Sequence, residues 1–411
     1  MSDQKKYRVL SLDGGGSWAT IQVAALSRLY SPDTRGHEVL KDFHHVAANS
    51  GGSIVLAGLL LNASLRELQE MFGDIAVREA LFTPLSSFEG GVIFSAIRRC
   101  VGFPRFYTAK KRDELNRLFT HLMQVNHIDS LELNALASGI RDDFHFTIVS
   151  YDYRRDRAKY FRSNTNSAAG SGSAAASTAN LVDAVHAAST APVQFFDRPA
   201  ESPNPSLQGE LFWDGAITGQ NNPIVAGVIE TLASGAARED VVVLSLGTGN
   251  NSIPPSLAKN PPWALTDRVS QLKEDVKKLA KAVVGDPPDH ASFVAHMLLS
   301  RTLPLAGDSR PFTNSPIVRM NPLIAPMPNP DGNPNGWIWP LGLRTPEQQK
   351  IIDLDMAAVT HSDFAMVEQL TVDWIAGRIR NQPIRMGSDL ACDMGDETFS
   401  NAMARWNQIR N

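Results

Sequence analysis

The chain has 411 residues, of which 43% are hydrophobic and 20% are charged, so it can build a large core without disulfide support. Two cysteines are too few for a disulfide framework or a cysteine-rich metal site, which favours a reducing compartment. A formal net charge of −4 gives no overall attraction to nucleic acid, and no nucleic-acid polymer is expected as a partner. Without a signal-peptide pattern or a membrane-length apolar run, we expect a cytoplasmic protein with at most transient peripheral membrane association.

The N-terminal part repeats a pattern of strand, loop and helix. The buried-type strand 9–12 ends in Asp13-Gly-Gly-Gly16, after which apolar residues recur at helical spacing. A second strand over 43–48 ends in a tight turn at 49–52, and 54–61 reads as a buried helix. Two such units so close together predict a parallel sheet with helices on its faces.

The remaining elements complete an α/β pattern. Further strands are predicted at 144–150, 159–162, 211–213 and 241–246, after which the strand signal stops near 249. Helical segments are predicted within 65–125, 265–283, 345–377 and 397–409, with a surface loop over 163–180 and irregular chain over 321–340. We therefore predict one three-layer α/β/α domain with a central, mainly parallel sheet. Its catalytic core spans 1–250, with 65–125 as a helical cap, and helical additions over 251–411 pack on the same domain.

Ser50 lies in a turn built from small residues. Ala48-Asn-Ser50-Gly-Gly52 is close to the small-x-Ser-x-Gly elbow, in which a strained strand-to-helix turn holds a serine hydroxyl at the end of a sheet. Small neighbours such as Gly52 are required because the turn packs tightly. On this spacing alone, a serine that caps a helix is the commoner explanation.

The glycines at positions 14 to 16 have an independent chemical meaning. Consecutive glycines before a helix can turn their amide hydrogens toward one point and hold an anion. In acyl transfer that anion is the tetrahedral oxyanion. A phosphate-binding loop is the rival interpretation, but the G-x-G-x-x-G pattern and the P-loop ending G-K-[ST] are both missing.

A serine nucleophile needs a base, which is commonly a histidine held by a carboxylate. The chain has ten histidines, so a triad stays open, although none has the context of a catalytic loop. Metal patterns fail: the EF-hand-like segment from Asp331 has Gly342 where a bidentate glutamate is needed, and His290 and His296 do not share a helical face. No metal or cofactor is predicted.

Several separated segments together resemble the patatin-like phospholipase family, and they occur in the family's order over roughly 1 to 250. The segments are Asp13-Gly-Gly-Gly16 for the oxyanion loop, Ser50 with Gly52 for the elbow, Ser189-Thr-Ala-Pro192 with Phe195, Asp214-Gly215-Ala216 for the catalytic aspartate, and 244–249 for the following strand. Taken alone, Asp214-Gly215 would indicate a turn.

The resemblance implies a serine–aspartate dyad that needs no histidine. Asp214 would accept the proton of Ser50, for which it must be desolvated, because an aspartate in water is a poor base. The bulky Leu211-Phe-Trp213 before it favours burial. The expected site has two catalytic residues, three oxyanion donors and three supporting residues: Ser50 and Asp214; Gly14, Gly15 and Gly16; Asp13, Gly52 and Gly215.

Two positions depart from the family's pattern. The glycine loop usually continues with an arginine and a glycine, where this chain has Trp18 and Ala19, and the elbow usually begins with a glycine, where this chain has Ala48. The alanines are small enough to fit. Trp18 removes a cation near the site and is expected to change how the loop is braced or how an acyl chain enters.

The predicted function is hydrolysis of phospholipid or lysophospholipid acyl esters through an acyl-enzyme. A weakly active or inactive patatin-fold protein that binds or senses lipid is one alternative, motivated by Trp18, and an esterase with a histidine triad is another. Membrane contact is expected first at the basic-aromatic segment 94–112 and second at the lysine-rich helix 268–283. Because bacterial relatives include lipases switched on by a nucleotide signal, a small-molecule activator stays open, as does a homo-oligomer.

Overall fold

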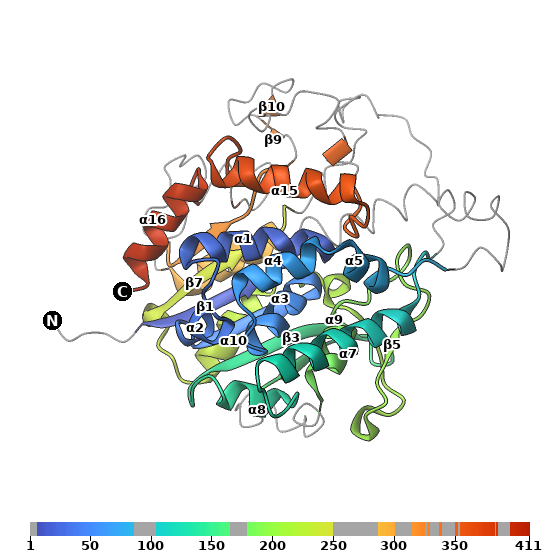
Figure 1. Cartoon of the computed structure of the whole chain (residues 1–411). Coiled ribbons are helices and arrows are strands. Elements are labelled where there is room, and N and C mark those ends of the chain that lie inside the picture. The colour runs from blue at the N-terminus through green and yellow to red at the C-terminus, as the bar shows by residue number, and fades with distance from the viewer. Residues whose placement is uncertain are drawn as a thin grey trace, which may run out of the picture.

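A mostly parallel sheet runs through the middle of the computed structural model, with helices on both of its faces (Figure 1). This arrangement is a three-layer α/β/α fold. The structure describes residues 6–85, 104–164, 179–249, 287–300, 315–324, 327–328, 337–338, 350–351, 354–382, 384 and 395–411.

Within these residues the main sheet has eight strands, in the order β5-β6-β3-β2-β1-β7-β8, with β4 paired to β3 off this path. Parallel pairing joins β3, β2, β1, β7 and β8, whereas β4 and β6 run antiparallel to β3, and β5 to β6. The strands are β1 (Tyr7–Leu12), β2 (His45–Asn49), β3 (His145–Asp152), β4 (Arg157–Arg162), β5 (Ala200–Glu201), β6 (Leu211–Asp214), β7 (Val241–Leu246) and β8 (Ile317–Met320). A separate hairpin joins β9 (Met327–Pro328) to β10 (Trp337–Ile338).

The helices follow the strand-helix alternation of the sequence. The α-helices are α1 (Thr20–Leu29), α2 (Gly36–Lys41), α3 (Ser50–Leu60), α4 (Leu65–Gly73), α5 (Ile75–Leu81), α7 (Thr108–Val125), α8 (Leu133–Ser138), α9 (Leu181–Ala188), α10 (Ile224–Ala233), α13 (Pro287–Leu299), α15 (His361–Ile375) and α16 (Phe399–Ile409). Short 3₁₀ helices are η1 (Gly16–Ala19), η4 (Pro205–Leu207), η5 (Gly215–Thr218) and η6 (Arg238–Asp240). None of these described helices is long and apolar enough to cross a membrane.

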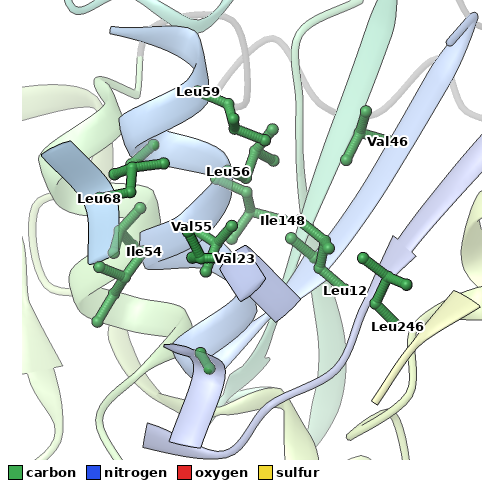
Figure 2. Close-up of a cluster of buried hydrophobic side chains, with 14 of the residues drawn as sticks. Leu12, Val23, Val46, Ile54, Val55, Leu56, Leu59, Leu68, Ile148 and Leu246 are labelled. Atoms are coloured by element: carbon green, nitrogen blue, oxygen red, sulfur yellow. The ribbon is translucent and has the colours of Figure 1, made fainter. Parts of the chain in front are cut away.

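Side-chain alternation along the central strands divides the core between the two faces. On β1, Leu10 and Leu12 belong to the cluster that includes α1 and α3, whereas Val9 belongs to the cluster of α10 and α13. Figure 2 shows the side chains that meet between the sheet and α3: Leu12, Val46, Ile148 and Leu246 from the strands, and Val55, Leu56 and Leu59 from the helix. Every residue of α3 is buried, so the start of this helix lies inside the molecule.

The prediction that the sheet ends near 249 is wrong, because β8 pairs in parallel with β7. Four residues with Arg319 among them give no apolar run, so the sequence carries no clear strand signal there. The part of the chain beyond residue 250 therefore contributes a strand to the sheet as well as helices. The predicted helix over 265–283 and most of the predicted loop over 163–180 lie outside the described residues.

The two C-terminal helices fall within the predicted ranges and pack on the N-terminal part of the chain. The indole of Trp406 on α16 stacks on the ring of Phe43, which precedes β2, at 5.9 Å between centroids. Trp374 on α15 is fully buried and its indole N–H donates to Asn381 Oδ1 at 2.7 Å. These helices share the main core and do not form a separate one.

Candidate active site

Ser50 occupies a strained turn between β2 and α3. Its φ angle is +46°, a region that non-glycine residues seldom adopt and that is typical of a nucleophile elbow. A Cβ atom at Gly52 would overlap the carbonyl oxygens of Leu12 and Asp13, so the turn requires a residue without a side chain there. The turn at Gly52 thus packs closely against the end of β1, which agrees with the small-residue pattern.

Strand register brings Asp214 to Ser50. Asn49, the last residue of β2, lies opposite Val149 of β3, and Asp214, the last residue of β6, lies opposite the next residue, Ser150. Both ends are therefore held beside the same stretch of β3. The Ser50 hydroxyl lies beside the Asp214 carboxylate and lowers its pKa as a hydrogen-bonding neighbour, and both side chains are buried.

The Asp214 carboxylate is desolvated yet well supplied with donors. Its Oδ1 atom accepts hydrogen bonds from the Ala216 amide at 2.9 Å and from Asn49 Nδ2 at 3.1 Å. Burial raises the pKa of Asp214 above its ordinary value, although the hydrogen bonds and the charge of Lys111 act in the opposite direction. A raised pKa makes this carboxylate a stronger base than an aspartate in water. The burial expected from the sequence before Asp214 is therefore present.

In the glycine loop after β1, the prediction for the Gly14 amide is corrected by the structure. The Gly14 amide donates to the carbonyl oxygen of Asn221 at 2.8 Å, so it is already engaged and cannot serve an oxyanion as predicted. The amides of Gly15 and Gly16 donate to no other backbone group within the described residues. Gly51 packs against Gly16, and its amide belongs to the first turn of α3, where N–H groups lack helical acceptors.

A buried ion pair holds Asp13 at the start of this loop. The Arg319 guanidinium of β8 binds both carboxylate oxygens of Asp13, at 2.8 and 2.5 Å, and also donates to Ser245 Oγ at 2.8 Å. All three residues are buried. Asp13 therefore supports the loop through a long-range partner that the sequence pattern did not indicate.

Trp18 braces the loop from the other side. Its indole N–H donates to the Asp355 carbonyl oxygen at 3.1 Å, while the amide and hydroxyl of Ser17 donate to the carbonyl oxygens of Met356 and Ala357. The Asp355 carboxylate in turn pairs with Arg105 at 2.5 Å. We call residues 355–357 the strap. Trp18, which stands where the family usually has an arginine, therefore connects the loop to the strap.

Histidine does not take part in the Ser50–Asp214 contact. The groups that act on the Asp214 carboxylate are the Ser50 hydroxyl, the Asn49 side chain, the Ala216 amide and the charge of Lys111. Burial lowers the pKa of His45 to about 3 and that of His186 well below its ordinary value, so both are neutral at physiological pH. Among the described residues, no cluster of three or more histidine, cysteine or acidic side chains could hold a metal ion; the EF-hand-like segment lies largely outside them.

The described end of the basic-aromatic segment is mostly engaged within the protein, although Lys110 is exposed. Phe106 is part of the hydrophobic core, Lys111 is buried, and Arg105 pairs with the strap. Residues 94–103 and the lysine-rich helix 268–283 lie outside the described residues. Phe106 and Lys111 are therefore unavailable for the predicted membrane contact at 94–112, which stays a prediction for the rest of the segment.

A sequence model of the patatin-like phospholipases matches residues 10–227, more than half of the chain and the stretch that contains Ser50 and Asp214. The chain belongs to the patatin-like phospholipase family. Membership supports lipid hydrolase activity in general. No curated protein sequence matches the chain.

Two solved structures are distantly similar to this patatin-like chain. The crystal structure of VipD from Legionella pneumophila is 12% identical, with 99% of this chain and 74% of VipD covered and a TM-score of 0.33. The crystal structure of the type III effector protein ExoU is also 12% identical, with 72% of this chain and 57% of ExoU covered and a TM-score of 0.24. Similarity at this level says nothing of substrate or activator.

Sequence motifs of the patatin-like family identified the residues that converge here but missed their supports. Asn49 could have been suspected from its place beside Ser50. Lys111 and Arg319 could not, because Lys111 sits in a charged run at a helix start, where solvent exposure is the usual outcome, and Arg319 lies in a weak strand.

Proposed function

We propose that this patatin-like protein hydrolyses fatty-acyl esters of phospholipids or lysophospholipids, with Ser50 as nucleophile and Asp214 as general base. The observation that carries the proposal is the placement of the Ser50 hydroxyl beside a buried carboxylate of raised pKa, on which it acts as a hydrogen-bonding neighbour. The positive φ angle of Ser50 supports the same role, because strained backbone at a strand-to-helix turn is typical of a nucleophile.

The reaction begins when Ser50 Oγ attacks the ester carbonyl carbon and its proton moves to the Asp214 carboxylate. In this proposal the amides of Gly15, Gly16 and Gly51 donate to the oxyanion of the tetrahedral intermediate. As the intermediate collapses, the carbon–oxygen bond to the alcohol breaks, and the alcohol leaves with the proton that Asp214 held. An acyl ester of Ser50 remains.

Water completes the cycle by the same route in reverse. Asp214 takes a proton from a water molecule whose oxygen attacks the acyl carbon, and the same amides receive the second oxyanion. Collapse releases the fatty acid and returns the proton to Ser50 Oγ. Because long-chain substrates reside in bilayers or micelles, transient contact between a cytoplasmic protein and a membrane surface belongs to the proposal.

Lipid release from a total phospholipid extract tests this function. We expect the purified protein to release free fatty acids, measured by mass spectrometry together with the lysolipids formed, and Ser50→Ala and Asp214→Ala to release none. Ser27→Ala on α1, whose hydroxyl only bonds the Val23 carbonyl, is the matched control and should retain full activity.

Two outcomes would count against the proposal. Undiminished release by Ser50→Ala would place the nucleophile elsewhere. A folded wild-type protein that hydrolyses no acyl ester would favour a lipid-binding or sensing role over catalysis.

A further inference from the structure

Lys111 is a buried cation that the proposed chemistry does not use. It lies in the first turn of α7, is only 3% exposed, and has no carboxylate within ion-pair distance among the described residues. Burying an ammonium group is costly unless its donors are satisfied. Its neighbour Lys110 is exposed, as expected of a charged run at a helix start.

All three donors of the Lys111 ammonium have acceptors at the carboxyl end of α9. Nζ donates to the His186 carbonyl oxygen at 3.2 Å, to Ser189 Oγ at 3.2 Å and to Thr190 Oγ1 at 2.6 Å. It also lies 4.3 Å from the centre of the Phe196 ring. A helix carboxyl end and an aromatic face both favour a cation, so these contacts stabilise the charged form.

Thr190 joins Lys111 to the candidate base. Its hydroxyl accepts from Lys111, and its carbonyl oxygen accepts the backbone N–H of Asp214 at 2.8 Å. The ammonium therefore holds the residue to which the end of β6 is bonded. The charge of Lys111 also acts on the Asp214 carboxylate and favours its ionised form.

We propose that Lys111 is a positioning residue for Asp214: through Thr190 it fixes the strand end that carries the base, and its charge keeps the carboxylate ionised. This role presupposes the Ser50–Asp214 chemistry proposed above. The mechanism gives the cation no contact with substrate, so Lys111 acts only through Asp214.

Other charged groups around the two residues are already accounted for. Arg112, the next residue of α7, pairs with Asp183 of α9 at 3.3 Å, and Glu114 pairs with Arg117 on the same helix at 2.5 Å. His186 is neutral because burial and the nearby cations lower its pKa. Among the described residues, Lys111 is the cation that acts directly on Asp214.

The sign of the effect follows from the charges. Lys111 lowers the pKa of Asp214, so replacing it by a neutral residue must raise that pKa further. Since the base must be ionised, the acid limb of the pH–rate profile then moves to higher pH.

The direct test is a titration of the Asp214 carboxyl by ¹³C NMR on protein labelled at aspartate Cγ, with the resonance assigned by its loss in Asp214→Asn. We expect the midpoint in Lys111→Met to lie about one pH unit above that of wild type. The matched control Lys110→Met should titrate as wild type, and Lys111→Arg, which keeps the charge, should restore most of the shift.

The outcomes separate this inference from the proposed function, because the titration needs no hydrolysis. An unchanged Asp214 midpoint in folded Lys111→Met would overturn the inference even if fatty-acid release is normal. If Lys111→Met does not fold, Lys111→Gln keeps a donor for Thr190 without the charge, and its midpoint supports or overturns the inference in the same way. Thermal unfolding of each variant identifies a merely structural effect, which lowers stability without moving the midpoint.

Discussion

At the residue scale, Asp214 takes the role of the triad histidine in the proposed mechanism, and the Asn49 side chain donates a hydrogen bond to it. The Asn49 amide donates to Asp214 Oδ1, while its remaining contact, with Asn221 Oδ1, is long at 3.5 Å. Gly215 is a glycine because a Cβ atom there would lie 2.7 Å from Asn49 Oδ1. The base is thus placed by the residue that precedes the nucleophile.

Asn49→Ala removes this donor and leaves Ser50 and Asp214 in the chain. A hydrogen bond to a charged group contributes roughly 1.5–3 kcal/mol, so we expect kcat to fall about ten- to a hundredfold. KM should change little, since Asn49 is buried and is not expected to contact substrate. Steady-state kinetics on a soluble acyl ester measures both, and an unchanged kcat in a folded variant would show that Asn49 does not orient the base.

At the element scale, the glycine loop is held between β8 on one side and the strap on the other. Trp18 replaces the family's usual arginine with an uncharged donor that reaches the Asp355 carbonyl. The strap links the loop to Arg105 and, through it, to the Gln194 carbonyl after α9. Segments far apart in sequence therefore hold the glycine loop in place near Ser50.

Trp18→Phe tests the strap, because it keeps an aromatic ring and deletes the indole N–H. We expect a loss of about 1 kcal/mol in the free energy of unfolding, measured by urea denaturation, and a lower kcat with KM unchanged. Tyr153→Phe at an exposed turn is the matched control and should behave as wild type. If Trp18→Phe matches wild type in both measurements, the strap does not brace the loop.

Local sequence patterns predicted the elements that form by local rules. Apolar runs such as 241–246 predicted strands of the sheet, and glycines before a helix marked the loop, because burial and turn geometry constrain neighbouring residues. Ser50 and Asp214 were found through their motifs. The engagement of the Gly14 amide by Asn221 had no sequence signal, because it depends on how two distant loops pack.

At the scale of the whole molecule, the C-terminal part is integral to the site. β8 extends the sheet beyond β7, and its Arg319 pairs with Asp13 beside the glycine loop. The carbonyl oxygen of Arg410, near the end of the chain, accepts from Arg8 on β1. A division between a core over 1–250 and later additions therefore does not describe what holds the site together.

Arg319→Met should destabilise the whole protein. Removing one partner leaves the Asp13 carboxylate buried and uncompensated, which costs roughly 3–5 kcal/mol of unfolding free energy. Arg378→Met, which breaks an exposed pair with Asp373, is the matched control and should cost less than about 1 kcal/mol. Urea denaturation compares the two variants. Equal losses in the free energy of unfolding would mean that the buried Asp13–Arg319 pair contributes no more to stability than an exposed pair.

The central claim, that Ser50 is a nucleophile activated by Asp214, is tested most directly by covalent labelling. A fluorophosphonate reacts with an activated serine, and peptide mass spectrometry locates the adduct. We expect one adduct, on Ser50 of the wild-type protein, with none in Ser50→Ala and labelling at least tenfold slower in Asp214→Asn, since general-base assistance is worth roughly 10²–10⁴ in rate. An adduct on another serine, or undiminished labelling in Asp214→Asn, would contradict the claim.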